Sequence, residues 1–378
     1  MNSKLKVLQF IPSLKVSDGG TTTYMQQLAP SLGKLCELHV CVSGNLEDCV
    51  PLEGCEVHSI SGGLLHLNTM KSQWLALLEQ IKPDVVHVNC CWLPQMALVS
   101  IWTKMHFKGR PNAPKLFLTP HGMLEPWILS RNYWTKKLPA ILLYQRRAIG
   151  ICDCIIATSE EEKQHIIELG WNTHVSVVQN GIDVEKVEVK TSWSDPCNLL
   201  FMSRVHPKKG LEILIDSLER LYQKNPDSKV QLSIVGDGDL PYVDRLKSMV
   251  NNRSLTNRIT FVGPVYGNSK WDLIRKADIL ILPSYSENYG LIVAESLASG
   301  TPVITTTGTP WHSIQSESCG WWVSPDVESL LKVLESLDNL TAEDMKNMGT
   351  KARLLAENDC SISAKVSLLY QLYISNNT

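Results

Sequence analysis

Two glutamates in the second half of the chain could bind the hydroxyl groups of a ligand. Glu287 lies in a polar loop after the apolar run 279–283, and Glu295 lies inside the apolar segment 291–299. A carboxylate among apolar side chains needs a hydrogen-bonding partner, and the two hydroxyls of a ribose would suit because one carboxylate can accept from both. A helix cap or an ion pair would use the same residues, so spacing alone leaves both interpretations open.

A basic pair precedes these glutamates in the loop 203–210. Arg204 and Lys209 follow the apolar run 199–202 directly. A guanidinium fork and an ammonium point charge on one loop can converge on a single anion, and such a pair could neutralise the charge on a departing nucleoside diphosphate. Solvated surface charge is the ordinary alternative.

Two weaker signals lie in the first half. Gly19 and Gly20 follow the first apolar run, in the loop 18–23 that leads into a helical segment. Adjacent glycines let backbone amides approach a diphosphate at a helix start, although a plain tight turn has the same sequence. The three-glycine dinucleotide fingerprint is absent. His121 follows the run 115–120. A lone histidine usually has a structural role, but its place at a strand end makes a functional role an equal alternative.

Short apolar runs that alternate with helical segments position these residues. Parallel α/β sheets have this pattern, and their ligands bind beyond the carboxyl ends of the strands. The polar stretch 184–196 is the best candidate for a linker and hinge, and the segment 362–374 has an apolar helical stripe. We expect an N-terminal Rossmann-like domain at 1–190, a C-terminal one at 191–361, and a return of 362–378 to the first. The expected strands are 6–11, 37–42, 85–89, 115–120, 154–158, 175–179, 199–202, 230–235, 258–262, 279–283 and 302–305.

In this order the motifs resemble family 4 glycosyltransferases over nearly the whole chain. The two glutamates, the basic loop and the segment 300–304 resemble the donor-binding half, and the glycine pair, His121-Gly122, Ser159 and 180–183 resemble the other half. The resemblance implies the GT-B fold, two facing Rossmann-like domains with a cleft between them. It also implies retention of anomeric configuration without a metal.

The resemblance assigns roles residue by residue. Glu295 would bind the ribose, Glu287 would lie near the donor sugar, and His121 would contact the transferred sugar. The implied catalytic residues are His121, Arg204, Lys209 and Glu287. The implied donor-binding residues are Gly19, Gly20, Arg204, Lys209, Val265, Glu287, Asn288, Tyr289, Gly290, Leu291 and Glu295. Backbone groups near Val265 would touch the nucleobase.

Donor and acceptor follow from the same resemblance. A UDP-sugar is preferred, with a GDP-sugar as the other option. The sequence 288–290 is Asn-Tyr-Gly where many members have Gly-Phe-Gly, so the mannosyl enzymes give no guide to the sugar. The segments 309–312 and 319–322 resemble members from capsule and O-antigen synthesis, which implies a glycan or undecaprenyl-linked acceptor. A catalytically silent sugar-nucleotide-binding subunit and a GT-B epimerase are the alternatives.

The segment 127–147 interleaves aromatic and aliphatic residues with five basic ones. A helix of this composition suits an anionic bilayer surface, and a partly buried helix with a solvated basic edge is the equal alternative. We therefore expect a cytoplasmic protein with a possible peripheral contact to the inner face of the cytoplasmic membrane.

Composition excludes several other classes. A formal net charge of −2 without a basic tract argues against a nucleic-acid partner, and eleven scattered cysteines suit a reducing cytosol. Asp237-Gly238-Asp239 matches the Asp-x-Asp pattern of metal-dependent transferases, but its place after an apolar run is typical of a strand-end turn. We expect no metal and no cofactor.

Overall fold

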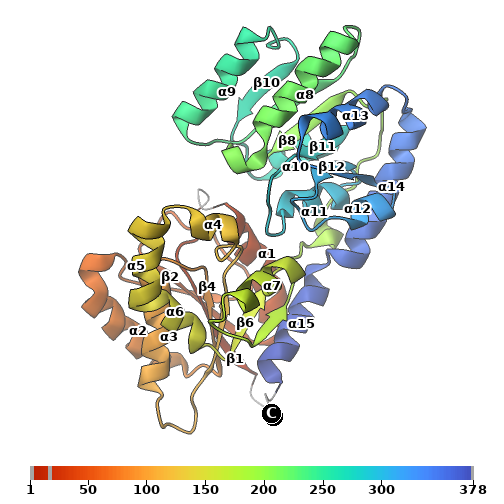
Figure 1. Cartoon of the computed structure of the whole chain (residues 1–378). Coiled ribbons are helices and arrows are strands. Elements are labelled where there is room, and N and C mark those ends of the chain that lie inside the picture. The colour runs from red at the N-terminus through yellow and green to blue at the C-terminus, as the bar shows by residue number, and fades with distance from the viewer. Residues whose placement is uncertain (1–3, 16–18, 376–378) are drawn as a thin grey trace. The chain divides into compact units, whose positions relative to one another are not determined.

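The computed structural model describes residues 4–15 and 19–375. The chain forms two compact units, one from Met1–Gly181 with Ile362–Thr378 and one from Ile182–Ser361 (Figure 1). Each unit is a parallel sheet with helices packed on it, so the α/β fold with two parallel sheets that the sequence predicts is confirmed.

The sheet of unit 1 has seven parallel strands in the order β3-β2-β1-β4-β5-β6-β7. Alternate residues of the strands pack into two apolar layers: Leu8 and Val86 point to one face of the sheet, and Val7 and Val85 point to the other. Both faces are therefore covered, as parallel sheets require. The strands are β1 (Lys6–Ile11), β2 (Glu37–Ser43), β3 (Glu56–Ile60), β4 (Val85–Asn89), β5 (Lys115–Thr119), β6 (Cys154–Ala157) and β7 (Val175–Val177).

Helices α1 (Gly20–Leu35) and α15 (Ile362–Ile374) pack together over one face of this sheet. Helix α15 thereby joins unit 1, although the whole of unit 2 separates it from the rest of that unit in sequence. On the other face lie α2 (Leu67–Ile81), after the short η2 (Leu64–His66), and α3 (Pro94–His106). Helix α7 (Glu160–Glu168) follows β6.

The sheet of unit 2 has six parallel strands in the order β10-β9-β8-β11-β12-β13. The strands are β8 (Asn198–Met202), β9 (Gln231–Val235), β10 (Ile259–Gly263), β11 (Ile279–Leu282), β12 (Val303–Thr306) and β13 (Gly320–Val323). The helices are α8 (Leu211–Lys224), α9 (Leu240–Asn252), α10 (Asn268–Lys276), α11 (Leu291–Ala298), α12 (Ser313–Ser316), α13 (Val327–Leu337) and α14 (Ala342–Asp359), with the short turns η5 (Val184–Lys186) and η6 (Pro207–Lys209).

Two expectations for the chain path differ from the structure. The segment 127–147 is no single helix, because Pro139 lacks an amide hydrogen and turns of different width alternate around it. The pieces are α4 (Pro126–Ser130), the π-turn η3 (Tyr133–Lys137), α5 (Leu138–Ala140), the π-turn η4 (Ile141–Gln145) and α6 (Arg146–Gly150). The edge strands β3 and β13 had not been expected.

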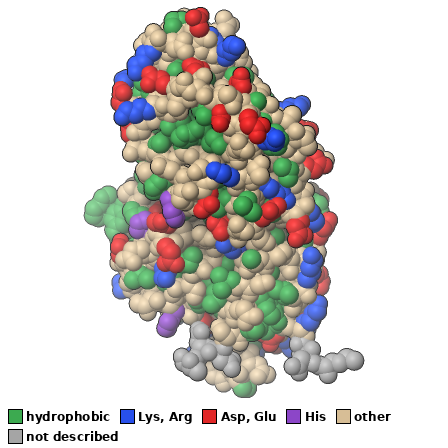
Figure 2. All heavy atoms as spheres, turned by 90° about the vertical axis from the view of Figure 1, so that its right-hand side faces the viewer, with side chains coloured by type: hydrophobic (Ala, Val, Ile, Leu, Met, Phe, Trp, Pro, Cys, Tyr) green, Lys and Arg blue, Asp and Glu red, His purple; other side chains and the backbone are tan. Residues whose placement is uncertain are grey.

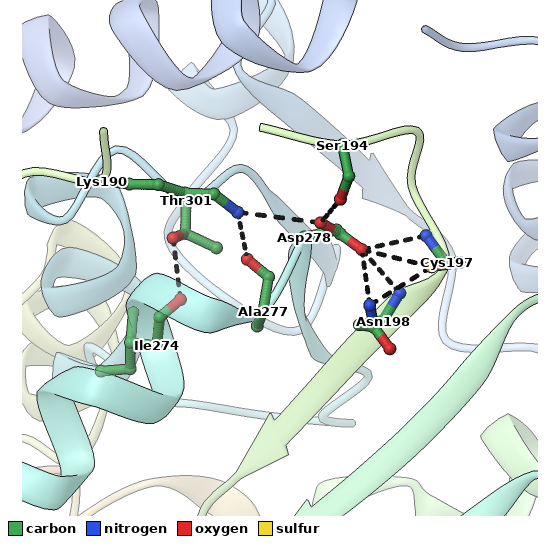
Figure 3. A network of polar contacts seen from close by, with 8 residues as sticks. All are labelled: Lys190, Ser194, Cys197, Asn198, Ile274, Ala277, Asp278 and Thr301. Carbon is green, nitrogen blue, oxygen red and sulfur yellow. Dashed lines mark hydrogen bonds and ion pairs between the residues drawn. The ribbon is translucent and has the colours of Figure 1, made fainter. Parts of the chain in front are cut away.

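The segment 184–196 packs against unit 2 instead of forming a free linker. The buried ammonium of Lys190 donates to the carbonyl of Ala277 at 2.6 Å and lies 3.8 Å from the carboxylate of Asp278 (Figure 3). That carboxylate also accepts from the hydroxyl of Ser194 at 2.7 Å and from the amide of Asn198 at 2.8 Å. The chain therefore passes between the units at 181–182 and 361–362, earlier than the expected boundary after residue 190.

Acidic and basic side chains mix over the face that Figure 2 shows, and neither sign forms a continuous field there. Among the described helices, none combines the length and the apolar character needed to span a membrane. All eleven cysteines are free thiols.

Candidate active site

Glycines bring the strand-end loops of unit 2 into direct backbone contact. The loop after β9 pairs with the loop after β8, because the amide of Val205 donates to the carbonyl of Asp237 at 2.6 Å. A Cβ at Gly236 would overlap the carbonyl of Ser203, and one at Gly238 would overlap that of Val205. Only glycine fits where backbones approach this closely.

The Asp-x-Asp pattern lies on this turn. Asp237 and Asp239 are exposed, and neither belongs to a group of side chains that could hold a metal ion within the described residues. The close backbone contact of this turn with Val205 explains the Asp-Gly-Asp sequence without a bound metal.

The loops after β8, β11 and β12 are joined in the same way. Gly210 has a φ of 69°, and a Cβ there would overlap the carbonyl of Pro283. A Cβ at Gly308 would overlap the carbonyl of Tyr285, and the amide of Glu287 donates to the carbonyl of Gly308 at 2.7 Å. The backbone position of Glu287 is therefore fixed by this hydrogen bond, independently of the contacts of its side chain.

Lys209 and Glu287 form an ion pair at this edge of the sheet. The ammonium of Lys209 contacts the carboxylate of Glu287, and the hydroxyl of Ser284 donates to the same oxygen at 2.7 Å. Burial alone would raise the pKa of the Glu287 carboxyl, but the charges of Lys209 and Lys208 and the two hydrogen bonds together lower that pKa below its usual value. Glu287 is thus held ionised.

Lys270 makes a second such pair with Glu295 and is not among the residues predicted from the sequence. Glu295 lies on α11 with a side chain only 3% exposed, and Lys270, on the first turn of α10, donates to its Oε1. The other carboxylate oxygen contacts no protein donor within the described residues. The two positions are far apart in the chain, and only the folded sheet brings the loop after β10 beside α11, so no spacing signal could have found Lys270.

Three other residues predicted from the sequence lie in unit 2. Arg204 is exposed, and the described residues show neither an acidic partner for it nor a contact between it and Lys209. The phenol of Tyr289 is buried against Trp311, whose indole N–H donates to the Tyr289 carbonyl. Only the backbone of Tyr289 is thus available to a ligand, and Val265 packs partly against the core of unit 2.

Gly290 is the N-cap residue of helix α11 and has a left-handed φ of 79°. Asn288 lies in the loop before it, and Leu291 is its first residue. The first amides of a helix have no intrahelical acceptor and carry partial positive charge. These amides are therefore available to an anion at the start of α11.

In unit 1, helix α1 begins at the glycine pair after β1. Gly19 has a φ of 66°, which favours glycine, and no side chain caps the first turn. A Cβ on Gly20 would meet no atom within 4 Å, so packing does not require glycine there. The residue before the pair, Asp18, lies outside the described residues. The open space at Gly20 suits the close approach of a ligand to the backbone.

Glu162, which was not predicted from the sequence, holds the loop after β5 in place. His121 has a left-handed φ of 54°, which is strained for a residue other than glycine. The buried carboxylate of Glu162 accepts from the amide of Gly122 at 2.6 Å and from that of Thr158 at 2.7 Å. Glu162 stands three residues after the N-cap Ser159, a capping pattern that could have revealed it.

A buried chain of hydrogen bonds then links His121 to α15. His121 Nε2 lies 3.0 Å from Asn89 Oδ1, and Asn89 Nδ2 donates to Gln9 Oε1 at 2.7 Å. Gln9 Nε2 donates to the Tyr373 hydroxyl at 3.0 Å, and that hydroxyl lies 2.6 Å from His87 Nδ1. Because both amide groups are oriented, Nε2 of His121 carries the proton and Nδ1 is an acceptor.

Burial keeps both histidines of this chain neutral. It lowers the pKa of His121 from 6.5 to about 4. For His87, burial first and the charge of His121 second lower the pKa from 6.5 to about 3. At neutral pH His121 therefore carries no charge and can accept a hydrogen bond from a hydroxyl.

Two parallel Rossmann-like sheets with charged and glycine-rich loops at the carboxyl ends of their strands form the GT-B architecture. Residues 18–186 match the family model described as Glycosyltransferase Family 4, and residues 183–355 match the model described as Glycosyl transferases group 1. The chain therefore carries a glycosyltransferase family 4 domain followed by a glycosyl transferases group 1 domain.

Relatives agree with this assignment. The chain is 28% identical over 188 residues to the uncharacterized glycosyltransferase MJ1607 of Methanocaldococcus jannaschii, covering 45% of this chain and 47% of that protein. It is 26% identical over 304 residues to a glycogen synthase of Mycobacterium tuberculosis, covering 78% and 69%. The matched part is thus about half the length of the first of these relatives. Anabaena Alr3699/HepE, solved in complex with UDP-glucose, has a TM-score of 0.75 at 18% identity and covers 97% of this chain and 99% of its own.

Proposed function

We propose that the chain transfers a hexosyl group from a nucleotide-diphosphate sugar, with UDP as the preferred nucleotide, to a glycan or lipid-linked acceptor. The observation that carries this proposal is the pair of Lys–Glu contacts at one edge of the unit 2 sheet. They present carboxylate acceptors for hydroxyls beside cations for a diphosphate. The family domains and the UDP-glucose complex of a neighbour of the same fold support it.

In the proposed reaction the acceptor hydroxyl attacks the anomeric carbon from the side that the diphosphate leaves. The new C–O bond forms as the bond to the diphosphate breaks, and the acceptor proton passes to the leaving phosphate oxygen. This course retains anomeric configuration and needs neither a protein base nor a metal. Arg204, Lys209 and the first amides of α11 would stabilise the growing negative charge.

His121 would bind the transferred sugar as a neutral acceptor. Its Nε2 proton is committed to Asn89, so Nδ1 offers a lone pair to a sugar hydroxyl. Its low pKa excludes the imidazolium form near neutrality. We therefore assign His121 a positioning role for the sugar and no proton transfer.

Donor binding is tested by thermal shift of the whole chain with UDP, GDP and their sugars, with EDTA present. We expect stabilisation by UDP compounds that survives EDTA and is lost in Glu295→Ala. The matched control is Glu335→Ala. Glu335 lies on α13 and also forms an ion pair with a lysine, Lys224 of α8, but this pair is exposed on the surface. If no nucleotide stabilises the protein, the donor site is wrong.

The products distinguish transfer from the alternatives. We expect proton NMR of the product to show the anomeric configuration of the donor. Inversion would refute the front-face course. Nucleotide binding without transfer to any acceptor would favour a silent subunit, and turnover of the sugar nucleotide alone would favour an epimerase.

We also propose that the segment 127–147 contacts an anionic membrane on the cytoplasmic side, where an undecaprenyl-linked acceptor in capsule or O-antigen synthesis would lie. Trp134, Leu142 and Leu143 are each more than 75% exposed. Arg146 and Arg147 are exposed beside them. Apolar anchors with basic neighbours favour an anionic bilayer surface.

Not every basic residue of the segment is available for this contact. The Lys137 ammonium lies 3.7 Å from the centre of the Trp92 ring, and burial lowers its pKa to about 8. Co-sedimentation with vesicles of anionic and of zwitterionic lipid tests the proposal. The combined Trp134→Ser, Leu142→Ser and Leu143→Ser variant should lose binding to anionic vesicles. The control Leu65→Ser, at a site 96% exposed, should retain it.

A further inference from the structure

Two adjacent strands of unit 1 carry the same short pattern, a glutamate two residues before a histidine. Glu37 and His39 lie on β2, and Glu56 and His58 lie on β3. Side chains two residues apart share a face of a strand, and the register pairs His39 with Glu56. Both histidines therefore point to the same side of the sheet edge.

Three of these side chains bring one possible ligand atom each within 4.8 Å of one another. His39 Nδ1 lies 3.0 Å from His58 Nε2 and 3.5 Å from Glu56 Oε2, and His58 Nε2 lies 3.8 Å from Glu56 Oε1. Zinc binds imidazole nitrogen and carboxylate oxygen at about 2.0–2.1 Å, which puts neighbouring tetrahedral ligands about 3.3 Å apart. The observed separations bracket that value.

The surroundings of His39 are those of a metal ligand. Its other ring nitrogen, Nε2, lies 3.2 Å from the carboxylate of Glu37. A carboxylate on the far nitrogen fixes the tautomer that leaves the near nitrogen as a ligand.

The three side chains differ in their exposure to solvent. The side chains of His39 and His58 are 8% and 14% exposed, whereas that of Glu56 is 65% exposed. The cluster is thus closed on the protein side and open at the carboxylate, which leaves an entry path and room for a water ligand.

We propose that His39, His58 and Glu56 bind one divalent transition-metal ion, with a water molecule as the fourth ligand. Two imidazoles and one carboxylate in this geometry favour Zn²⁺. Glu37 is the positioning residue for His39.

The site lies away from the proposed donor loops. His39 and Glu56 are near the first residues of their strands, whereas Gly20 and His121 follow the carboxyl ends of β1 and β5 in the same parallel sheet. The ion would therefore clip the edge strand β3 to β2 and take no part in sugar transfer. A clip of this kind also blocks pairing of an exposed sheet edge with another chain.

Cobalt(II) and zinc binding to the EDTA-treated, desalted whole chain test the proposal. We expect one equivalent of Co²⁺ to give the visible bands of a tetrahedral site and Zn²⁺ to displace it. His39→Ala and His58→Ala should each weaken Zn²⁺ binding at least about 100-fold, and Glu37→Gln about 10- to 100-fold. The control is His66→Ala, since His66 is exposed and outside the cluster.

Two further measurements keep the outcome decisive. If a histidine variant does not fold, Glu56→Gln removes one ligand at an exposed position and should still weaken binding. A sulfur-to-cobalt charge-transfer band that persists in these variants would place the ion on cysteines and overturn the proposal. Zinc binding that is the same in the wild type and in every ligand variant would also overturn it. Thermal shift by UDP should be the same with and without Zn²⁺, so this test is independent of the donor site.

Discussion

Acid should destabilise unit 1 through His87. This side chain is fully buried and bonded to Tyr373 and Thr119. Its pKa is about 3 in the folded chain against 6.5 in the unfolded chain. Because the folded pKa is the lower one, the neutral histidine contributes stability above pH 6.5 that is lost as the pH falls toward 3. Each pH unit below 6.5 costs about 1.4 kcal/mol, so His87 accounts for about 2 kcal/mol at about pH 5.

The variant His87→Gln isolates this contribution, because glutamine remains neutral and can still form hydrogen bonds. Urea unfolding at about pH 8 and pH 5, read by pulsed hydrogen exchange of the β4 peptide, gives the free energy of unfolding of unit 1. The loss of stability between the two pH values should be smaller in His87→Gln by about 2 kcal/mol, and unchanged in the exposed control His66→Gln. An equal loss in wild type and His87→Gln would refute the argument that burial keeps His87 neutral.

Three further predictions concern the proposed site. Tyr373→Phe removes the hydroxyl that ends the chain from His121, so kcat/KM should fall about 10-fold with little change in UDP affinity; a parallel loss of affinity would argue for a purely structural effect. Lys270→Met leaves the Glu295 carboxylate buried and unpaired, which should cost about 3 kcal/mol in urea unfolding, and adding Glu295→Gln should restore most of it. Gly238→Ala should lower the thermal midpoint because its Cβ meets backbone, whereas Gly20→Ala should keep the midpoint and weaken UDP binding; the reverse pattern would contradict both assignments.

The fold could be predicted because both sheets are parallel. Buried parallel strands appear as continuous apolar runs, and such runs marked every strand except β3 and β13. Both lie at sheet edges: polar residues interrupt β3, and β13 has only four residues, Gly-Trp-Trp-Val. Segment 127–147 was expected as one helix, since an apolar and basic composition does not reveal where π-turns widen the backbone.

The site could be predicted only in part. Glu287, Lys209 and the glycine loops stand out because each follows a strand, and Glu295 stands out because its segment is otherwise apolar. Lys270 was invisible because its partner is distant in sequence. The metal cluster was missed for a related reason, since β3 had not been expected and two of the three protein ligands, Glu56 and His58, lie on it.

The backbone contacts among the four strand-end loops of unit 2 bear on the thermodynamics of ligand binding. Loops that order upon binding lose conformational entropy, which weakens affinity. Here the carbonyls of Ser203, Val205, Pro283 and Tyr285 already lie against glycines, so that entropy is lost during folding. Calorimetry of nucleotide binding should therefore show a small entropic penalty. Differences in sugar preference among relatives should arise from the side chains of these loops, because their backbone is already ordered.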